Sequence, residues 1–273
     1  MSSDDFLSLS VDEILDEARY GKSLIIVEGE YDYIYEYIDG NNCEITTVQK
    51  LINQSGNRAV EKLVLEIESF AKDEELEYKS HILGIIDRDY REYENRLTQC
   101  EILYILDFYS IESYFVNREV LKNMLLFVIR SERLVTDTLI DKIYYIISME
   151  LESELYLNSI KDLKTHLDFQ QDILSLEERF NISKSFEILL KITKGKTLLN
   201  RFILKNIEYQ QKLYNWCRDG DIISCKNIES SEHNKFCLYK ITKYNTHQLR
   251  NIVLKNTNIT SLTPIKERLK QLR

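Results

Sequence analysis

Acidic side chains follow two apolar segments in the first third of the chain, at the point where each segment ends. Glu28 and Asp32 follow one such segment, and Asp87 and Asp89 follow another. Carboxylates that converge on one point repel one another, and a hard divalent cation such as Mg²⁺ or Mn²⁺ relieves this repulsion through oxygen ligation. A carboxylate-held cation is well suited to phosphodiester hydrolysis, because it lowers the pKa of a bound water and neutralises charge on the phosphoryl group.

Two further features strengthen this acidic pattern. On an extended backbone the carboxylates of Asp87 and Asp89, two residues apart, would point to the same side. A third apolar segment is followed by Asp107 and then by Ser110, which could cap a helix carrying Glu112 in its first turn. The alternative for each acid taken singly is a solvated loop position, but the combined spacing favours a functional site.

The segments that must position these acids alternate between strand-like and helical patterns. A capping box, Ser10 to Glu13, opens a helix that extends to about residue 19. Strands separated by helices predict right-handed βαβ units and a parallel sheet that is covered on both faces. The expected strands are 23–27, 43–48, 82–86 and 102–106, and the expected helices between them are 31–38 and 58–72.

From about residue 110 the pattern is mainly helical. We therefore predict an α/β domain over residues 1–125 and a mainly α-helical, basic C-terminal region over residues 126–273. Residues 220–247 give no clear pattern. The expected helices are 110–130, 134–153, 159–170, 172–179 and 185–194, with a last basic helix over 265–272 after Pro264.

The charge is distributed unevenly along the 273 residues. The net charge of −9 would argue weakly against a nucleic-acid partner. Residues 1–120, however, hold 27 acids and 11 bases, whereas residues 181–273 hold 7 acids and 18 bases. A basic segment attached to an acidic one suggests contact with nucleic acid. The alternative is that the two ends neutralise each other by packing together.

Composition also excludes several classes of protein. With 7 Gly and 1 Pro, collagen-like and linker-dominated architectures are ruled out, and so are glycine-rich phosphate loops. The N-terminus does not resemble a secretory signal, and the longest apolar run is far shorter than the ~20 residues that span a bilayer. Five cysteines fit reduced thiols. We therefore expect a cytoplasmic protein that makes no membrane contact.

The motifs around the two acidic strand ends resemble the Toprim domain, the catalytic module shared by topoisomerases, primases and OLD-family nucleases. These motifs are Val-Glu-Gly-Glu-Tyr-Asp at 27–32 and Gly-Ile-Ile-Asp-Arg-Asp at 84–89. The stretch 106–115, in which an Ile-Glu pair opens a helix, is similar to the DUF4435 branch of Toprim proteins. That branch includes the nuclease effector of the PARIS anti-phage system. The resemblance covers residues 20–120 well and the helical remainder only in outline.

The resemblance implies a Toprim-type sheet and a Mg²⁺- or Mn²⁺-dependent endonuclease. Position by position, Glu28 matches the family's acid or base and metal ligand. Asp32, Asp87 and Asp89 match the other metal-binding acids, and Glu112 matches the later acidic ligand of the nuclease branch. It further implies an anti-phage effector controlled by an ABC-type ATPase partner, with RNA such as tRNA as substrate and a homodimer in the active state.

Basic residues supply the remaining candidates. OLD-like enzymes use a downstream lysine, for which Lys196 is our first choice and Lys194 the second; it would stabilise developing phosphate charge. The alternative is a basic helix end on the surface. Basic residues that could contact the phosphate backbone are spaced along the C-terminal region, with a solvated face as the alternative. They are Lys191, Lys194, Arg201, Lys205, Lys240 and Lys243.

Several alternatives remain beside this interpretation. The protein could be a catalytically silent, Toprim-like regulatory or nucleic-acid-binding protein, or an OLD-like nuclease that cuts DNA. A primase is disfavoured because the associated segments are missing. Gly195-Lys196-Thr197 resembles the end of a Walker A motif, but position 190 is leucine, so ATP would have to come through a partner. Zinc binding is a weak alternative for Cys217, Cys225, His233 and Cys237, which lack a Cys-x₂-Cys pair.

Overall fold

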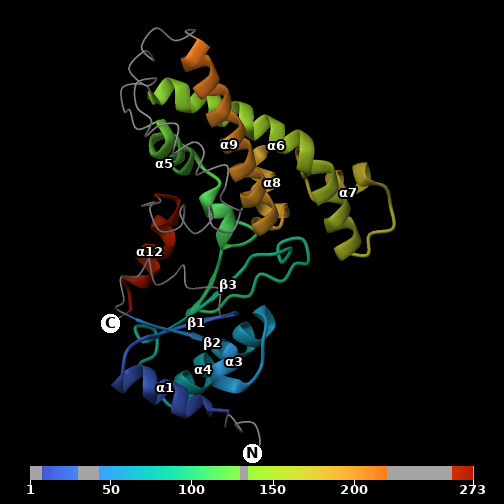
Figure 1. The fold of residues 1–273 in the computed structure, drawn as a ribbon. Helices are drawn as coiled ribbons and strands as arrows, with labels where there is room; N and C mark the ends of the chain where they lie inside the picture. Colours follow the sequence, from blue (N-terminus) through green and yellow to red (C-terminus); the bar gives the residue numbers. More distant parts are fainter. Residues whose placement is uncertain (1–7, 30–42, 130–134, 220–259, 273) are drawn as a thin grey trace, which may run out of the picture. The chain divides into compact units, whose positions relative to one another are not determined.

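The computed structural model describes residues 8–29, 43–129, 135–219 and 260–272 (Figure 1). The chain forms two compact units. The first, which we call the sheet unit, comprises residues 1–107 and 261–273, and the second, the helical unit, comprises residues 108–260. The division after Asp107 therefore lies before the predicted boundary at residue 125, and the C-terminal residues belong with the sheet.

The sheet unit is built on four parallel strands. Their order is β2-β1-β3-β4, so the chain moves from β1 to one neighbour and then returns to pair on the other side of β1. Ile26 is paired with Thr46 on one side and with Gly84 on the other. Ligands of open α/β sheets bind where the strand order reverses, at the carboxyl ends of the strands. The strands are β1 Leu24–Val27, β2 Glu44–Thr47, β3 Ile82–Ile86 and β4 Leu103–Ile105.

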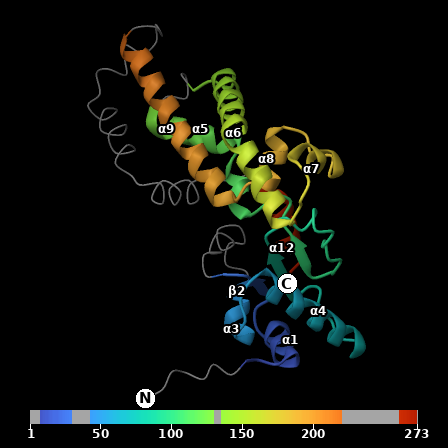
Figure 2. The same ribbon diagram turned by 90° about the vertical axis from the view of Figure 1, so that its right-hand side faces the viewer.

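Helices cover the sheet because their apolar stripes match its buried strands. Figures 1 and 2 show α1, α3 and α4 on one face of the sheet, and Figure 1 shows α12 on the other. Gly84 in β3 permits the close approach of α4, because an added Cβ would lie 2.7 Å from Val64 Cγ1. The capping box predicted at Ser10 and Glu13 is confirmed. The helices of this unit are α1 Val11–Tyr20, α3 Val48–Ile52, α4 Asn57–Asp73 and α12 Thr263–Leu269.

The helical unit packs its helices around a core in which Tyr114, Phe115 and Phe202 are almost fully buried. Helix α6 packs against α5, α7, α8 and α9, and α9 also packs against α5 and η1. Its described elements are the 3₁₀ helix η1 Ile111–Phe115, then α5 Arg118–Ile129, α6 Asp137–His166, α7 Ile173–Arg179, α8 Phe186–Ile192 and α9 Gly195–Asp219. A short 3₁₀ helix, η3 Thr260–Leu262, joins the two units along the chain.

These observations confirm an α/β fold with a parallel sheet flanked by helices and a mainly helical region after it. Three details of the prediction were wrong. Segments 134–153 and 159–170 form the single helix α6, because the residues between them include no helix breaker and Leu155 and Tyr156 continue its buried face. The segment 110–130 begins as the 3₁₀ helix η1 and becomes α-helical only at Arg118. The helices α3 and α9 were not predicted.

Other predictions fall on residues outside the described ranges. They include the helix expected over 31–38 and the poorly patterned segment 220–247. Among the helices that are described, none combines the length and the apolar character needed to cross a bilayer.

Candidate functional site

Two of the predicted acids meet at the carboxyl edge of β1 and β3. Glu28 directly follows the end of its strand after Val27, and Asp89 belongs to the turn that leaves β3. Glu28 is half-buried, and this burial raises its pKa above the usual 4.5; the nearby negative charge of Asp89 raises the pKa further, while Arg91 opposes the shift. The charge of one carboxylate therefore acts on the other, as expected for two members of one site.

Asp87 and Asp89 do not share an extended backbone, contrary to the prediction. Strand β3 ends at Ile86, and Asp89 has a φ of +47° in the left-handed region. Aspartate adopts this region more readily than most residues, because its short polar side chain can bond locally. The chain therefore turns at Asp89, and the carboxylate is placed by this turn rather than by strand alternation. Asp87 is half-buried directly after the strand.

The sequence prediction missed Asn57, the first residue of α4. Its Nδ2 donates a 2.7 Å hydrogen bond to Asp89 Oδ2, across 32 positions of sequence. Its Oδ1 is buried and receives no hydrogen bond from any residue that the structure describes. The preceding Gly56 has a φ of +94°, and Glu28 Oε1 lies 4.0 Å from the position that a Cβ would take there. The start of α4 thus borders both carboxylates. In the sequence, only the Gly56-Asn57 pair could have indicated a turn at this place.

A buried ion pair holds the turn that carries Asp89 against α4. Arg91 Nη1 lies 2.7 Å from Glu61 Oε2, with side chains only 4% and 12% exposed. Thr98 also donates a hydrogen bond to Glu61, and Arg96 lies 3.9 Å away. These contacts hold the pKa of Glu61 below its usual value even though burial works in the opposite direction. The connection from β3 to β4 is therefore anchored within a few residues of Asp89.

The donor atoms at this edge suit a hard cation. Glu28 and Asp89 offer carboxylate oxygens, and Asn57 offers a buried amide oxygen that lacks a partner in the described structure. Within the described ranges, no group of three or more His, Cys, Asp or Glu side chains is arranged to hold a metal ion. Asp32, the fourth predicted acid of this edge, lies outside those ranges. The residues present fit Mg²⁺ by the type of their donor atoms.

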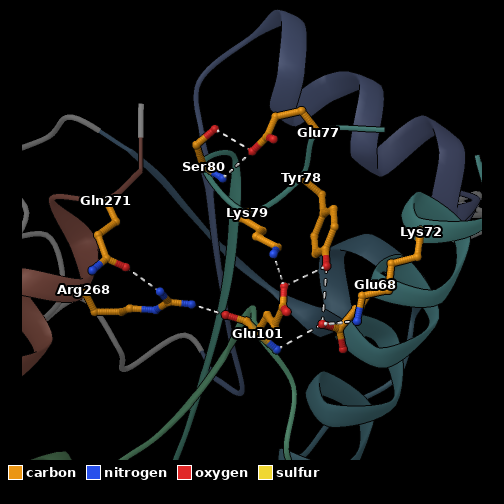
Figure 3. A network of polar contacts seen from close by, with 9 residues as sticks. All are labelled: Glu68, Lys72, Glu77, Tyr78, Lys79, Ser80, Glu101, Arg268 and Gln271. Carbon is orange, nitrogen blue, oxygen red and sulfur yellow. Dashed lines mark hydrogen bonds and ion pairs between the residues drawn. The ribbon is translucent and has the colours of Figure 1, made fainter. Parts of the chain in front are cut away.

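A second acidic cluster in the sheet unit shows the opposite chemistry (Figure 3). Glu68 is 9% exposed in its side chain, yet it accepts hydrogen bonds from the Glu101 amide at 3.1 Å and pairs with Lys72 at 3.1 Å. Glu101 in turn pairs with Lys79 and accepts a hydrogen bond from Tyr78. Burial disfavours ionisation of Glu68, but these partners outweigh it and lower its pKa. This cluster therefore contains its own positive partners, Lys72 and Lys79.

Arg268 of α12 joins this network through the chain itself. Its Nη2 donates a hydrogen bond to the Glu101 carbonyl, and its Nη1 donates one to Gln271 (Figure 3). The basic C-terminal helix is thereby tied to the segment that precedes β4. This contact helps to explain why the C-terminal residues belong to the same compact unit as the sheet.

Two other predicted features come together in the helical unit. Glu112 lies in η1, and Gly195 begins α9 between the candidate lysines Lys194 and Lys196. An added Cβ on Gly195 would overlap Ser110 Oγ and lie 3.2 Å from Glu112 Cβ. Glu112 is held by a 2.6 Å hydrogen bond from Ser110, and both lysine side chains are exposed. The glycine therefore allows the lysine segment to approach the acid closely.

The basic residues predicted to contact phosphate are not all free. Arg201 pairs with Glu154 at 3.2 Å, and Lys205 pairs with Glu150 at 2.8 Å, which raises the pKa of Lys205. At these two positions of α9 the basic charge is therefore neutralised within the helical unit by acids of α6, and not by the acidic N-terminal segment. Lys191 is half-buried near the end of α8. The remaining candidates for nucleic-acid or zinc binding, Lys240, Lys243, Cys225, His233 and Cys237, lie outside the described ranges, as does the side chain of Cys217.

No protein-family model and no curated protein matches the chain.

Proposed function

We propose that this protein is a Mg²⁺-dependent Toprim-type endonuclease that hydrolyses phosphodiester bonds of nucleic acid. The observation that carries the proposal is the meeting of Glu28 and Asp89 at the switch point between β1 and β3, where the charge of Asp89 and burial raise the pKa of Glu28. Two carboxylates that act on each other in this way would be stabilised by a bound cation. The motif resemblance supports the same assignment.

Each acid has a defined role in this proposal. Glu28, Asp87 and Asp89 would hold the cation, with Asp32 and Glu112 as further ligands. The bound cation would supply a water of lowered pKa and neutralise charge on the phosphoryl group. By the motif resemblance, Glu28 would also act as the acid or base that transfers a proton at a reacting oxygen. Lys196, or Lys194, would stabilise the negative charge that develops on phosphate.

The biological setting follows from the resemblance and is part of the proposal. We infer an anti-phage effector, silent until released by an ABC-type ATPase partner, with tRNA or another RNA as the preferred substrate and a homodimer as the active form. The exposed Lys194 and Lys196, together with Lys191, Arg201, Lys205, Lys240 and Lys243, would contact the phosphate backbone. Two of these bases would then exchange a carboxylate partner for phosphate.

The test is cleavage by the full chain, alone and together with the product of the gene next to its own. Labelled tRNA, single-stranded DNA and duplex DNA are incubated with Mg²⁺ or with EDTA. We expect Mg²⁺-dependent cleavage that is lost in Glu28→Gln and in Asp89→Asn. Two exposed acids of α4 provide matched controls, Glu66→Gln and Asp73→Asn, which should cleave normally.

Three outcomes of this assay oppose the proposal in different ways. Cleavage that persists in Glu28→Gln would remove the site assignment. Binding of nucleic acid without cleavage, unchanged by EDTA, would favour the catalytically silent regulatory protein. Cleavage of duplex DNA with no action on tRNA would favour an OLD-like nuclease and overturn the preference for RNA.

A further inference from the structure

The side-chain amide of Asn57 has two polar atoms, Nδ2 and Oδ1, with different roles. The hydrogen bond from Nδ2 to Asp89 Oδ2 fixes the orientation of the amide, because only the NH₂ group can donate to a carboxylate. Oδ1 must then point away from that contact. It is buried, and no described residue donates a hydrogen bond to it. A buried carbonyl oxygen without a partner weakens folding, so a ligand that it faces would restore the lost interaction.

The acids beside Gly56 and Asn57 indicate the charge of that ligand. Glu28 Oε1 lies 4.0 Å from the position a Cβ would take on Gly56, the residue before Asn57. Asp89 is in direct contact with the amide of Asn57. Two carboxylates and an amide oxygen are acceptors only, and together they attract a cation. An anion would meet repulsion from both acids.

We propose that Asn57 is a further residue of the cation site, in which Nδ2 positions the Asp89 carboxylate and Oδ1 is a neutral oxygen ligand of the divalent ion. This inference deepens the proposed function and rests on it. A neutral oxygen adds ligation without adding a third negative charge to Glu28 and Asp89, so the site stays foldable when the cation is absent. Amide oxygens serve as ligands of this kind for Mg²⁺ and for related hard cations.

The fold explains why an asparagine can serve at this position. Asn57 is the first residue of α4, and Gly56, with its φ of +94°, makes the turn that brings the side chain to the carboxyl edge of β1 and β3. Glu61, four residues later on the same helix, anchors the Asp89 turn through Arg91. The start of α4 is thus fixed relative to Asp89 at two places, and the amide is held in position before a cation arrives.

The experiment measures Mn²⁺ binding to the full chain by isothermal titration calorimetry, independently of cleavage. We expect Asn57→Ala to weaken Mn²⁺ binding roughly 10–100-fold, the usual effect of removing a supporting group at a metal site. Asn57→Asp restores an oxygen at the same place and is expected to bind Mn²⁺ at least as tightly as the wild type. Gln54→Ala removes an exposed amide from the same connection and should leave the affinity unchanged.

Thermal melting of the same variants controls for folding. Asn57→Asp places a third negative charge in the site, so its melting temperature should fall in EDTA and rise more than that of the wild type when Mn²⁺ is added. If Asn57→Asp binds Mn²⁺ more weakly than Asn57→Ala does, the ligand role of Oδ1 is overturned. Unchanged Mn²⁺ affinity in a folded Asn57→Ala overturns the whole inference.

The failure of this inference and that of the proposed function are distinguishable. Weakened Mn²⁺ binding in Asn57→Ala, in a protein that cleaves none of the nucleic acids, supports the cation site and overturns the nuclease. Mg²⁺-dependent cleavage with Mn²⁺ affinity insensitive to Asn57→Ala supports the nuclease and overturns the role of Asn57. A wild type that binds no Mn²⁺ overturns the inference about Asn57.

Discussion

Arg91 and Glu61 form an ion pair of 2.7 Å with side chains that are 4% and 12% exposed. Arg91 follows Asp89 by two residues, and Glu61 follows Asn57 by one helical turn. The pair therefore joins the two segments that meet at the candidate cation site, the turn after β3 and the start of α4. Because the pair is buried, the loss of either charge leaves the other charge unpaired in a region of low dielectric constant.

Replacement of Arg91 by methionine should lower the free energy of unfolding by about 3 kcal/mol, near the lower end of the range for a broken buried ion pair. The lower end is expected because Thr98 and Arg96 still serve Glu61. Urea denaturation measures the change. Lys62→Met is the matched control, since its partner Glu66 is exposed and such pairs contribute under about 1 kcal/mol. Equal effects of the two substitutions would contradict the structural role of Arg91.

Acid should destabilise the protein through Glu68. Burial opposes its ionised form, but the Glu101 amide and Lys72 outweigh this and hold the pKa of Glu68 below the usual 4.5. A lowered pKa in the folded state means that the stabilisation is present above pH ~4.5 and is lost as pH falls through the folded pKa. Unfolding free energies measured from pH 7 to pH 3 should fall less steeply in Glu68→Gln. Parallel curves for the variant and the wild type would rule out this contribution.

The sheet could be predicted from sequence because its signals are local. Four short strand-like segments became β1 to β4, and the periodic apolar stripe of residues 58–72 became α4. The placement of Glu28 and Asp87 followed from the strand ends alone, since parallel strands carry their carboxyl ends to one edge. The start of α1 could be predicted equally well, because a capping box is contained within four consecutive residues.

The contacts that complete the site could not be predicted from the sequence in the same way. Asn57 meets Asp89 only because the start of α4 lies beside the turn after β3, a relationship across 32 residues that no spacing rule reports. Asp89 adopts a left-handed backbone conformation that is most often occupied by glycine, so its sequence gives no sign of the turn. An extended backbone over Asp87 and Asp89 was therefore wrongly predicted. Helix α6 was divided for a similar reason, since the break was placed in a segment whose burial depends on its packing against α8 and α9.

Gly84→Ala should destabilise the sheet unit. The added Cβ would lie 2.7 Å from Val64 Cγ1 and 3.3 Å from Val60 Cγ1, so α4 must shift away from β3. Overpacking of this kind costs about 1–3 kcal/mol, measurable by urea denaturation. Gly29→Ala is the control, because a Cβ there meets nothing within 4 Å among the described atoms. A Gly84→Ala variant as stable as Gly29→Ala would show that α4 approaches β3 less closely than described.

Gly195→Ala should disturb the contact between the lysine segment and Glu112 in a way that a second substitution partly reverses. The added Cβ would overlap Ser110 Oγ and lie 3.0 Å from Ser113 Oγ, so Gly195→Ala alone should lower the free energy of unfolding by about 1–3 kcal/mol. Ser110→Ala removes the overlapping hydroxyl, although it also removes the hydrogen bond to Glu112, worth about 1 kcal/mol. In a double-mutant cycle the two substitutions should therefore be less destabilising together than the sum of their separate effects. Strictly additive effects would indicate that Gly195 and Ser110 are not in contact. They would also contradict the close approach of the lysine segment to Glu112.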